Sequence, residues 1–449
     1  MRKIVILGAG PTGLGAAYRL QELGYSNWTI YEKNPYIGGL SASLKDDRGF
    51  TWDIGGHVIF SHYAYFDNLM KKFLGKRVVK NMRESWIWLK DQFIRYPFQN
   101  NFHFLPRDTV LECVMGIINI KKNSRKLKNF EEWILSIFGE GVSKYFMLPY
   151  NWKVWATPPR KMGFDWIAER VSVIDIERVL VNIIYNREDH NWGPNNYFEF
   201  PLHGGTGGLF SAFEPHIKDH LSLNREAVAI DPKTKTVKFA DGETVEYDVL
   251  ISTLPINELV AGLTGKPAGV QRAADGFHWS SSLVVGLGLE KPCPSNKNWM
   301  YFPQNDSPFY RVTYLSNYSP NMTPRPSSKY FSFLCETSYS SYKKVNKKKI
   351  IDETIQGLIN SKLLTKKDLS RMISRYLIDV KYAYPVPFLK RDRLLGIVQP
   401  FLENEKIYSR GRFGGWKYEV GNMDHSVMQG VEVVDRILTR KKEKTYSWR

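Results

Sequence analysis

The clearest chemical pattern of the chain lies in its first sixty residues, where three glycines have the spacing GxGxxG: Gly8, Gly10 and Gly13. Residues 3–7 (KIVIL) before them are typical of a buried parallel strand, and residues 12–23 after them carry apolar side chains at helical spacing. This order lets the chain turn tightly and direct a helix N-terminus at a pyrophosphate. A second predicted strand at 28–31 ends at Glu32, where an acid accepts hydrogen bonds from the ribose hydroxyls of an adenine dinucleotide. We therefore predict dinucleotide binding.

Two further glycine pairs indicate which dinucleotide is bound. Gly38-Gly39 follows Glu32 closely, and Gly55-Gly56 directly precedes His57. Glycines lack a Cβ, so they let the backbone approach a flat ligand. A domain that binds only a nicotinamide dinucleotide needs neither pair, whereas the long body of FAD needs several close backbone approaches. The set of glycines therefore favours FAD.

The composition is that of an ordinary globular chain of 449 residues, which excludes disorder, collagen and coiled coil. Lysine and arginine exceed aspartate and glutamate by 18, so the protein attracts anions such as nucleic acid, anionic lipid or phosphorylated metabolites. A basic surface kept for solubility explains the same excess. Because no nucleic-acid-binding motif accompanies the charge, we expect no nucleic-acid partner.

Cysteine and histidine spacing predicts neither a disulfide framework nor a metal site. The three cysteines, Cys113, Cys293 and Cys335, are too few and too far apart for a framework or a CxxC pair, and the nine histidines show no metal-ligand spacing. No apolar run reaches the ~18 residues that a membrane span needs, and glycines interrupt the apolar stretch near the N-terminus that could otherwise be a signal peptide. We expect a soluble, cytoplasmic protein with no membrane partner and no metal.

The remainder of the chain predicts helices and strands in interleaved modules of an α/β fold. Apolar periodicity favours helices at 107–120, 130–138 and 166–185, and alternation favours several strands from residue 227 onward. Thr365 and Asp368 have the spacing of a capping box, which predicts a short helix there. A last amphipathic helix is expected over 424–438, with Asp424 as its capping residue.

Several unusual strings, in one order, relate the chain to a known family. They are GGHVIFS at 55–61, YPFQNN at 96–101, NWGPN at 191–195, FYR at 309–311, and GRFG at 411–414 followed by YEVGN at 418–422. With these strings the chain resembles the UDP-galactopyranose mutases, in their eukaryotic-type branch, from about residue 2 to about residue 437. We therefore expect a discontinuous FAD-binding Rossmann-type domain over 1–80, 203–226, 247–275 and 400–449. A helical substrate lid is expected over 105–190, and an antiparallel sheet substrate domain over 81–104, 191–202, 227–246 and 276–399.

The resemblance implies a flavin-dependent isomerase, of the intramolecular transferase type, that interconverts UDP-galactopyranose and UDP-galactofuranose. The reaction has no net redox change but requires reduced FAD, with NADPH as the implied reductant. In the family, N5 of reduced FAD attacks the anomeric carbon and UDP leaves. The ring then opens through a flavin iminium adduct and recloses through another hydroxyl before UDP returns. The protein's part is to position the sugar, stabilise charge and exclude water.

The resemblance also implies which residues hold the flavin. They are Gly8, Gly10, Gly13, Glu32, Gly39, Gly56, His57, Arg83, Arg412 and Asn422. His57 corresponds to a histidine on a mobile loop beside the isoalloxazine. We expect the residues closest to the chemistry, other than the flavin itself, to be His57, Arg170 and Arg311.

The substrate residues implied by the resemblance fall into three groups. The diphosphate is expected at Arg170, Arg311, Tyr384 and Tyr418, because guanidinium forks and phenol hydroxyls can pair pyrophosphate oxygens without a metal. The uridine pocket is expected at Tyr96, Phe98, Gln99, Phe146, Asn151 and Trp155, where rings stack on uracil and amides bind its polar edge. The sugar end is expected at Asn195, Trp299 and Tyr301.

Two departures from the family pattern leave the substrate open. Leu148 stands where a basic residue is expected beside the uridine, and His203 where an arginine is expected. One alternative is therefore the same ring contraction on another nucleotide-activated hexopyranose. Others are a net-redox flavoenzyme of the amine-oxidase or desaturase kind, and a flavin fold that has lost FAD and binds a protein partner. The oligomeric state is also open.

Overall fold

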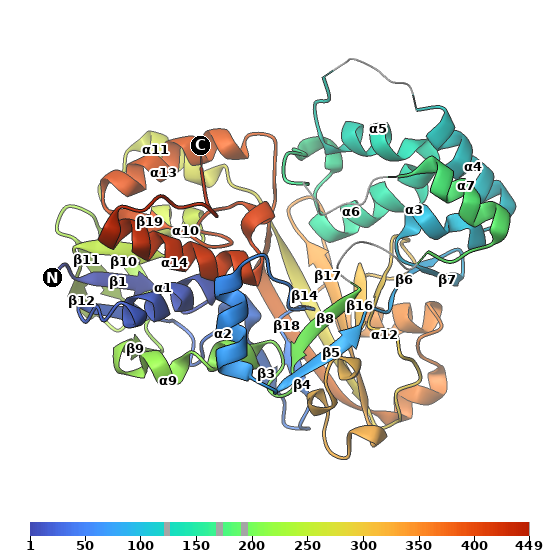
Figure 1. Ribbon diagram of the computed structural model, residues 1–449, viewed down its shortest axis with the longest axis horizontal. Helices are drawn as coiled ribbons and strands as arrows, with labels where there is room; N and C mark the ends of the chain where they lie inside the picture. The colour runs from blue at the N-terminus through green and yellow to red at the C-terminus, as the bar shows by residue number, and fades with distance from the viewer. Residues whose placement is uncertain (121–125, 168–173, 190–195, 449) are drawn as a thin grey trace.

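The computed structural model describes residues 1–120, 126–167, 174–189 and 196–448 and has two principal sheets (Figure 1). The first is a parallel five-stranded sheet in the order β19-β13-β1-β2-β9. Its strands are β1 Ile4–Leu7, β2 Trp28–Tyr31, β9 Leu221–Ser222, β13 Val249–Ser252 and β19 Ile407–Ser409. β1 and β13 are buried along their whole length, as expected for short apolar strands covered on both faces. The predicted strands at 3–7 and 28–31 are confirmed.

The two ends of the chain meet on this sheet, because α1 Pro11–Glu22 packs beside α14 Met423–Thr439 (Figure 1). Glycines make the approach close: a Cβ on Gly15 would lie 2.4 Å from the carbonyl oxygen of Val427, and one on Gly430 2.1 Å from that of Thr12. Neither distance is compatible with a side chain, so the two helices pack backbone against backbone.

The second principal sheet has seven strands in the order β18-β14-β17-β16-β15-β6-β7. All its pairings are antiparallel except that of β15 with β6. The strands are β6 Ser85–Leu89, β7 Gln92–Arg95, β14 Trp279–Leu289, β15 Trp299–Tyr301, β16 Arg311–Tyr314, β17 Phe331–Tyr339 and β18 Met372–Pro385. Figure 1 shows this sheet between the N-terminal sheet and a group of helices formed by residues 98–185.

Three small sheets complete the strands. They are β3 Ser43–Lys45 with β4 Thr51–Asp53, β5 Val78–Met82 with β8 Tyr197–Pro201, and β10 Ala227–Asp231 with β11 Thr236–Phe239 and β12 Thr244–Glu246. The segment 227–246 was expected in the large antiparallel sheet, but it forms this separate three-stranded sheet instead. It lies against β2: the ring of Phe239 is 4.6 Å from that of Tyr31, and Arg225 N–H donates to the carbonyl oxygen of Glu32 at 2.8 Å.

The helical group consists of α3 Phe98–Asn101, α4 Arg107–Ile118, α5 Phe130–Val142, α6 Leu148–Trp155 and α7 Ile176–Tyr185. The predicted helices at 107–120 and 130–138 are confirmed. The predicted helix at 166–185 is wrong at its start, because Trp166 lies in a turn, residues 174–175 are not helical, and the helix begins at Ile176; residues 168–173 lie outside the described part of the chain. Asp175, rather than an apolar residue, begins it by accepting hydrogen bonds from the N–H groups of Glu177 and Arg178.

The other helices lie around the two principal sheets. They are α2 Ala64–Leu74, α8 Gly207–Ser211, α9 Glu214–Ile217, α10 Ile256–Gly262, α11 Ala268–Asp275, α12 Ile350–Asn360 and α13 Arg391–Asn404. The capping box predicted at Thr365 and Asp368 is present and begins a short 3₁₀ helix, Lys366–Arg371. Within the described residues, none of the helices has both the length and the apolar character that crossing a bilayer requires.

The start of α14 differs from the prediction. Asn422, not Asp424, is the N-cap residue, and its side chain makes no capping hydrogen bond. Asp424 lies one residue inside the helix, where its Oδ2 accepts hydrogen bonds from the backbone N–H of His62 and lies 2.8 Å from His62 Nδ1. A partner 362 residues away therefore takes the carboxylate that local spacing assigned to the cap.

Replacing Gly430 with alanine tests the contact between α1 and α14. The added methyl would meet the backbone of α1, so we expect Gly430→Ala to lower the free energy of unfolding by about 3 kcal/mol in urea denaturation. Gly396→Ala is the matched control, because Gly396 lies on an exposed face of α13 with no heavy atom within 4 Å of the added Cβ. The control is expected to be neutral or to gain up to about 1 kcal/mol from helix propensity. Equal effects of the two changes would contradict the close packing.

Candidate functional site

The glycine turn after β1 has the geometry of a phosphate-binding turn. Gly8 has a φ of +94°, and a Cβ on Gly13 would lie 1.9 Å from the carbonyl oxygen of Gly8. The N-cap residue Gly10 has no side chain that could cap the first turn of α1. The backbone N–H groups of that turn can therefore bind an anion. The sequence pattern is thus realised in the fold as strand, tight turn and helix.

Glu32, at the end of β2, lies beside this turn. Its Oε2 accepts the N–H of Ala9 at 2.7 Å, and its Oε1 accepts the backbone and side-chain N–H groups of Asn34 at 2.9 and 2.7 Å. The carboxylate is 5% exposed, so these hydrogen bonds hold it in one orientation next to the turn. This is the position expected of an acid that binds a ribose.

Two other glycine segments converge on the same turn. Gly38 N–H donates to Ala9 O at 2.8 Å, and a Cβ on Gly39 would lie 3.1 Å from Gly10 Cα. From the other end of the chain, a Cβ on Gly411 would lie 2.5 Å from Thr12 Oγ1. The backbone therefore encloses the helix N-terminus closely on two sides, and this cradle would be filled by side chains if the glycines were replaced.

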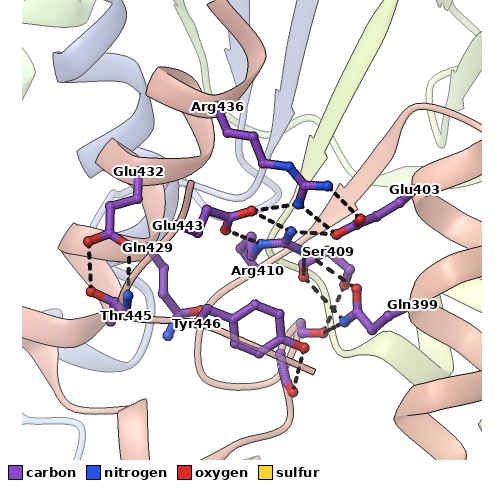
Figure 2. A network of polar contacts seen from close by, with 12 residues as sticks. Gln399, Glu403, Ser409, Arg410, Gln429, Glu432, Arg436, Glu443, Thr445 and Tyr446 are labelled. Atoms are coloured by element: carbon purple, nitrogen blue, oxygen red, sulfur yellow. Dashed lines mark hydrogen bonds and ion pairs between the residues drawn. The ribbon is translucent and has the colours of Figure 1, made fainter. Parts of the chain in front are cut away.

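A buried ionic network holds the segment around Gly411 in place (Figure 2). Arg410 is 1% exposed and donates to Glu443 and Glu403, each at 2.6 Å, and Arg436 donates to the same two carboxylates. The chain after Arg410 is tied by hydrogen bonds to backbone atoms. Gly411 N–H donates to Gln429 Oε1, and the carbonyl oxygens of Gly414 and Gly415 accept from Gln399, Ser409 and Tyr446. The C-terminal segment, residues 441–448, thus contributes Glu443 and Tyr446 to these contacts.

Arg311, the first residue of β16, is fixed by a buried carboxylate. Glu336 is its direct cross-strand partner on β17, and Glu336 is 3% exposed. Arg311 donates through Nε to Glu336 Oε2 and through Nη2 to Glu336 Oε1 at 2.8 Å, and Nη2 also donates to the carbonyl oxygen of Gly56 at 3.0 Å. Burial lowers the pKa of Arg311, but Glu336 outweighs it and the pKa ends well above its usual value. Arg311 is therefore charged and held against the His57 loop.

Tyr310 and Tyr384 extend this cluster. Tyr310 Oη–H donates to Glu336 Oε1 at 3.0 Å, and the hydroxyls of Tyr310 and Tyr384 lie 3.2 Å apart. Burial, with Glu336 next to it, raises the pKa of Tyr310 well above its usual value, and burial also raises that of Tyr384. Both phenols keep their protons at neutral pH, and the Tyr310 proton is donated to Glu336.

His57 is neutral in this environment. Burial lowers its pKa to about 4, and the positive charges of Arg311 and Arg412 act in the same direction against the opposing charge of Glu336. Its Nδ1 is buried and has no hydrogen-bond partner among the described residues. An uncharged imidazole whose ring nitrogen has no hydrogen-bond partner can bind a polar edge of a ligand. The ring system of a flavin has such edges.

The aromatic residues predicted at the substrate site form two sets. In the first, the ring of Trp155 lies 5.7 Å from that of Tyr384 and 4.8 Å from that of Tyr418, and the Arg412 guanidinium lies 5.1 and 5.4 Å from the two tyrosine rings. Arg412 is oriented by donating to the carbonyl oxygens of Gly421 and Ala383. Arg412 is thus a second cation, in addition to Arg311, next to these tyrosine rings.

The second set runs from the helical group to β15. Adjacent rings are Phe98 and Phe146 at 5.0 Å, Phe146 and Tyr150 at 5.2 Å, and Tyr150 and Tyr301 at 5.2 Å. Tyr96 lies 5.2 Å from Tyr301, whose hydroxyl accepts from Trp299 Nε1 at 2.7 Å. Arg83, predicted at the flavin, has its guanidinium over the rings of Tyr96 and Trp299, at 4.9 and 5.3 Å.

The remaining predicted residues differ in how they are placed. Phe98 is fully buried and Gln99 is 4% exposed, and Asn151 Nδ2 donates to the carbonyl oxygen of Met147 at 2.8 Å within the helical segment. Asn422 lies at the start of α14, next to Gly421. Arg170 and Asn195 lie outside the described residues.

Three residues of the cluster were not predicted: Glu336, Tyr310 and Tyr150. Glu336 is an acid inside the buried strand FSFLCETSY, and an unpaired acid there would be costly. That signal could have identified it as the partner of a cation. Tyr310 lies within the string FYR and Tyr150 follows Phe146 by four residues, but sequence spacing does not show that these tyrosines contact Glu336, Tyr384 and Tyr301.

Comparisons with known proteins agree with this geometry. The profile of the family described as "Flavin containing amine oxidoreductase" matches residues 11–419. The crystal structure of a reduced UDP-galactopyranose mutase superposes with a TM-score of 0.95 at 45% identity, covering 99% of this chain and 96% of that one. Putrescine oxidase bound to putrescine has a TM-score of 0.67 at 16% identity, with 98% and 99% covered, and the CLA-producing fatty acid isomerase from P. acnes has 0.66 at 14%, with 98% and 99% covered. These last two share the fold.

A sequence match of smaller extent points to the same fold. The 4,4'-diapophytoene desaturase (4,4'-diaponeurosporene-forming) of Staphylococcus aureus strain COL is 45% identical over 65 residues. That segment is 14% of this chain and only 12% of the desaturase. The similarity to this relative is therefore local and carries no information on what the whole chain acts on.

Neutralising Glu336 tests the buried ion pair. Glu336→Gln keeps the shape but leaves the Arg311 charge without its partner, so we expect the free energy of unfolding to fall by about 3 kcal/mol in urea denaturation. Glu290→Gln, at an exposed position after β14, is the matched control and is expected to change it by less than about 0.5 kcal/mol. Loss of the same size in both variants, or in neither, would contradict a pairing role for Glu336.

Proposed function

Because the chain belongs to the UDP-galactopyranose mutase family of flavin-containing amine oxidoreductases, we propose that it interconverts UDP-galactopyranose and UDP-galactofuranose with bound FAD. The observation that carries the proposal is the extent of the similarity, 45% identity over 99% of the chain to a protein of that activity. The putrescine oxidase structures of similar fold are 15–16% identical, so they support the flavin fold and not a net oxidation.

The residues of the cradle fit FAD. The N-terminus of α1 would hold the pyrophosphate, and Glu32 would accept the ribose hydroxyls. When bound and reduced, FAD supplies the nucleophile, its N5, toward the anomeric carbon. Arg311 is tied to the segment next to His57, since it donates to the carbonyl oxygen of Gly56.

In the proposed complex, Arg311, Tyr384 and Tyr418 bind the diphosphate, together with Arg170. The support is chemical: a charged guanidinium fixed by Glu336, the Tyr384 phenol, whose raised pKa keeps its proton, and the Tyr418 hydroxyl are donors for phosphate oxygens. UDP leaves as an anion and must be held until it returns, so fixed cations stabilise it without reorganisation. Arg412, over the same tyrosine rings, adds to the positive potential.

The aromatic set that ends at Tyr301 supports the assignment of the uridine and sugar ends. Uracil would stack near Tyr96 and Phe146, and the sugar would lie toward Trp299 and Tyr301, with Asn195 also assigned there. Tyr150 joins these two parts by its ring contacts with Phe146 and Tyr301. Aromatic walls exclude water, which would otherwise hydrolyse an activated sugar.

The activity is tested on the purified holoprotein with UDP-galactofuranose under anaerobic conditions. We expect dithionite-reduced protein, and NADPH-reduced protein, to form UDP-galactopyranose, and the oxidised protein to be inactive. Chromatography of the nucleotide sugars is the measurement. Full activity of the oxidised form would contradict the flavin nucleophile, and oxygen consumption that depends on substrate would favour the net-redox alternative. Conversion of another UDP-hexose in place of UDP-galactose would favour the alternative substrate that the departures at Leu148 and His203 leave open.

Replacing the arginine forks tests the diphosphate site. Arg311→Lys keeps the charge that Glu336 needs but removes Nη1, the part of the guanidinium that is not bonded to Glu336 or Gly56, so we expect the Kd for UDP to rise roughly 10- to 100-fold in a calorimetric titration. Arg170→Lys is expected to act in the same direction. Arg375→Lys, at an exposed position of β18, is the control and should leave the Kd unchanged. Unchanged UDP affinity in both site variants would show that the diphosphate binds elsewhere.

A further inference from the structure

Two histidines and an aspartate converge at the start of α14. His62 lies in the segment between the His57 loop and α2, and Asp424 and His425 lie in the first turn of α14. His62 Nδ1 is 2.8 Å from Asp424 Oδ2, and His425 Nδ1 is 3.0 Å from Asp424 Oδ1. The three potential ligand atoms all lie within 4.8 Å of one another.

The surroundings hold these groups in position. Asp424 is 1% exposed, and its Oδ2 also accepts a hydrogen bond from the backbone N–H of His62. This bond fixes the backbone at His62. The ring of His425 packs edge-on against Tyr63 at 5.5 Å, and the Tyr63 hydroxyl is bonded to Thr445 in the C-terminal segment. The side chain of His62 is 57% exposed, so the group is open to solvent on one side.

The donor set is one that a first-row transition metal prefers. Tetrahedral Zn²⁺ with bonds of about 2.1 Å separates its ligand atoms by about 3.4 Å. The two histidines contact different oxygens of Asp424, at 2.8 and 3.0 Å, so the ligand atoms must rearrange around one ion, and the exposed ring of His62 can move to do so. Water would complete the coordination.

We propose that His62, Asp424 and His425 form a binding site for a divalent transition-metal ion of the Zn²⁺ class, which ties the segment after His57 to the N-terminus of α14. The ion replaces the two histidine–carboxylate hydrogen bonds with three coordinate bonds. His62 is five residues from His57, and Asp424 is two residues from Asn422. A bound ion therefore joins two segments that flank the proposed flavin site. The inference does not depend on the proposed reaction.

The experiment uses the full-length holoprotein, treated with a chelator and then dialysed. Zn²⁺ is titrated against a competing chromophoric chelator at pH 7.5, and the melting temperature is measured with and without the ion. We expect one equivalent to bind and the melting temperature to rise, because the ion binds the folded arrangement. Co²⁺ in place of Zn²⁺ is expected to give the visible absorption of a four-coordinate site.

The variants decide whether these residues bind the ion. His62→Gln and His425→Gln are each expected to weaken Zn²⁺ binding at least tenfold and to abolish the thermal shift. His203→Gln, which removes another exposed histidine, is expected to change neither. Binding that is absent in the wild type, or that persists equally in both site variants, would overturn the proposal and leave a pair of histidine–carboxylate hydrogen bonds. The far-UV spectrum and flavin content of each variant confirm that it is folded.

Discussion

The close packing of α1 against α14 is the contact on which the candidate site depends. α1 follows the glycine turn, and α14 follows the segment that contains Arg412 and Asn422. Only because Gly15 and Gly430 lack side chains can the two backbones touch at Val427 and Thr12. The first and last parts of a 449-residue chain thus meet at one helix N-terminus. A cofactor bound there would contact both.

Buried charge determines where the surrounding loops lie. Removing a guanidinium from water costs several kcal/mol, so a buried arginine must have a carboxylate partner in good geometry. Arg410 finds Glu403 and Glu443, and Arg311 finds Glu336. Arg311 also donates to the carbonyl oxygen of Gly56, and Arg410 directly precedes Gly411, so each buried pair fixes the position of a glycine segment. The excess of positive charge over the whole chain adds a general attraction for a diphosphate, while these pairs give the site its geometry.

Much of the fold follows from local patterns. The strand-turn-helix order at 3–23, the helices beginning at Arg107 and Phe130, and the capping box at Thr365 were predictable because hydrophobic periodicity and capping act over a few residues. The prediction was wrong at two places. Asp424 was predicted as a helix cap, but it binds His62, a partner far away in the sequence. Strands 227–246 were predicted in the large antiparallel sheet, but they pair with one another beside β2, where Phe239 packs on Tyr31.

The dinucleotide turn, the acid that follows β2, the family and the kinds of residue at the candidate site could all be predicted from the amino-acid sequence. They depend on residue type at short spacing, and backbone sterics and helix capping translate such spacing directly into structure. Three contacts became visible only in the folded chain: Glu336 pairs with Arg311, Tyr150 links the two ends of an aromatic set, and His62 lies beside Asp424 and His425. Strand register and helix packing create these contacts, and both depend on the whole core being assembled at once.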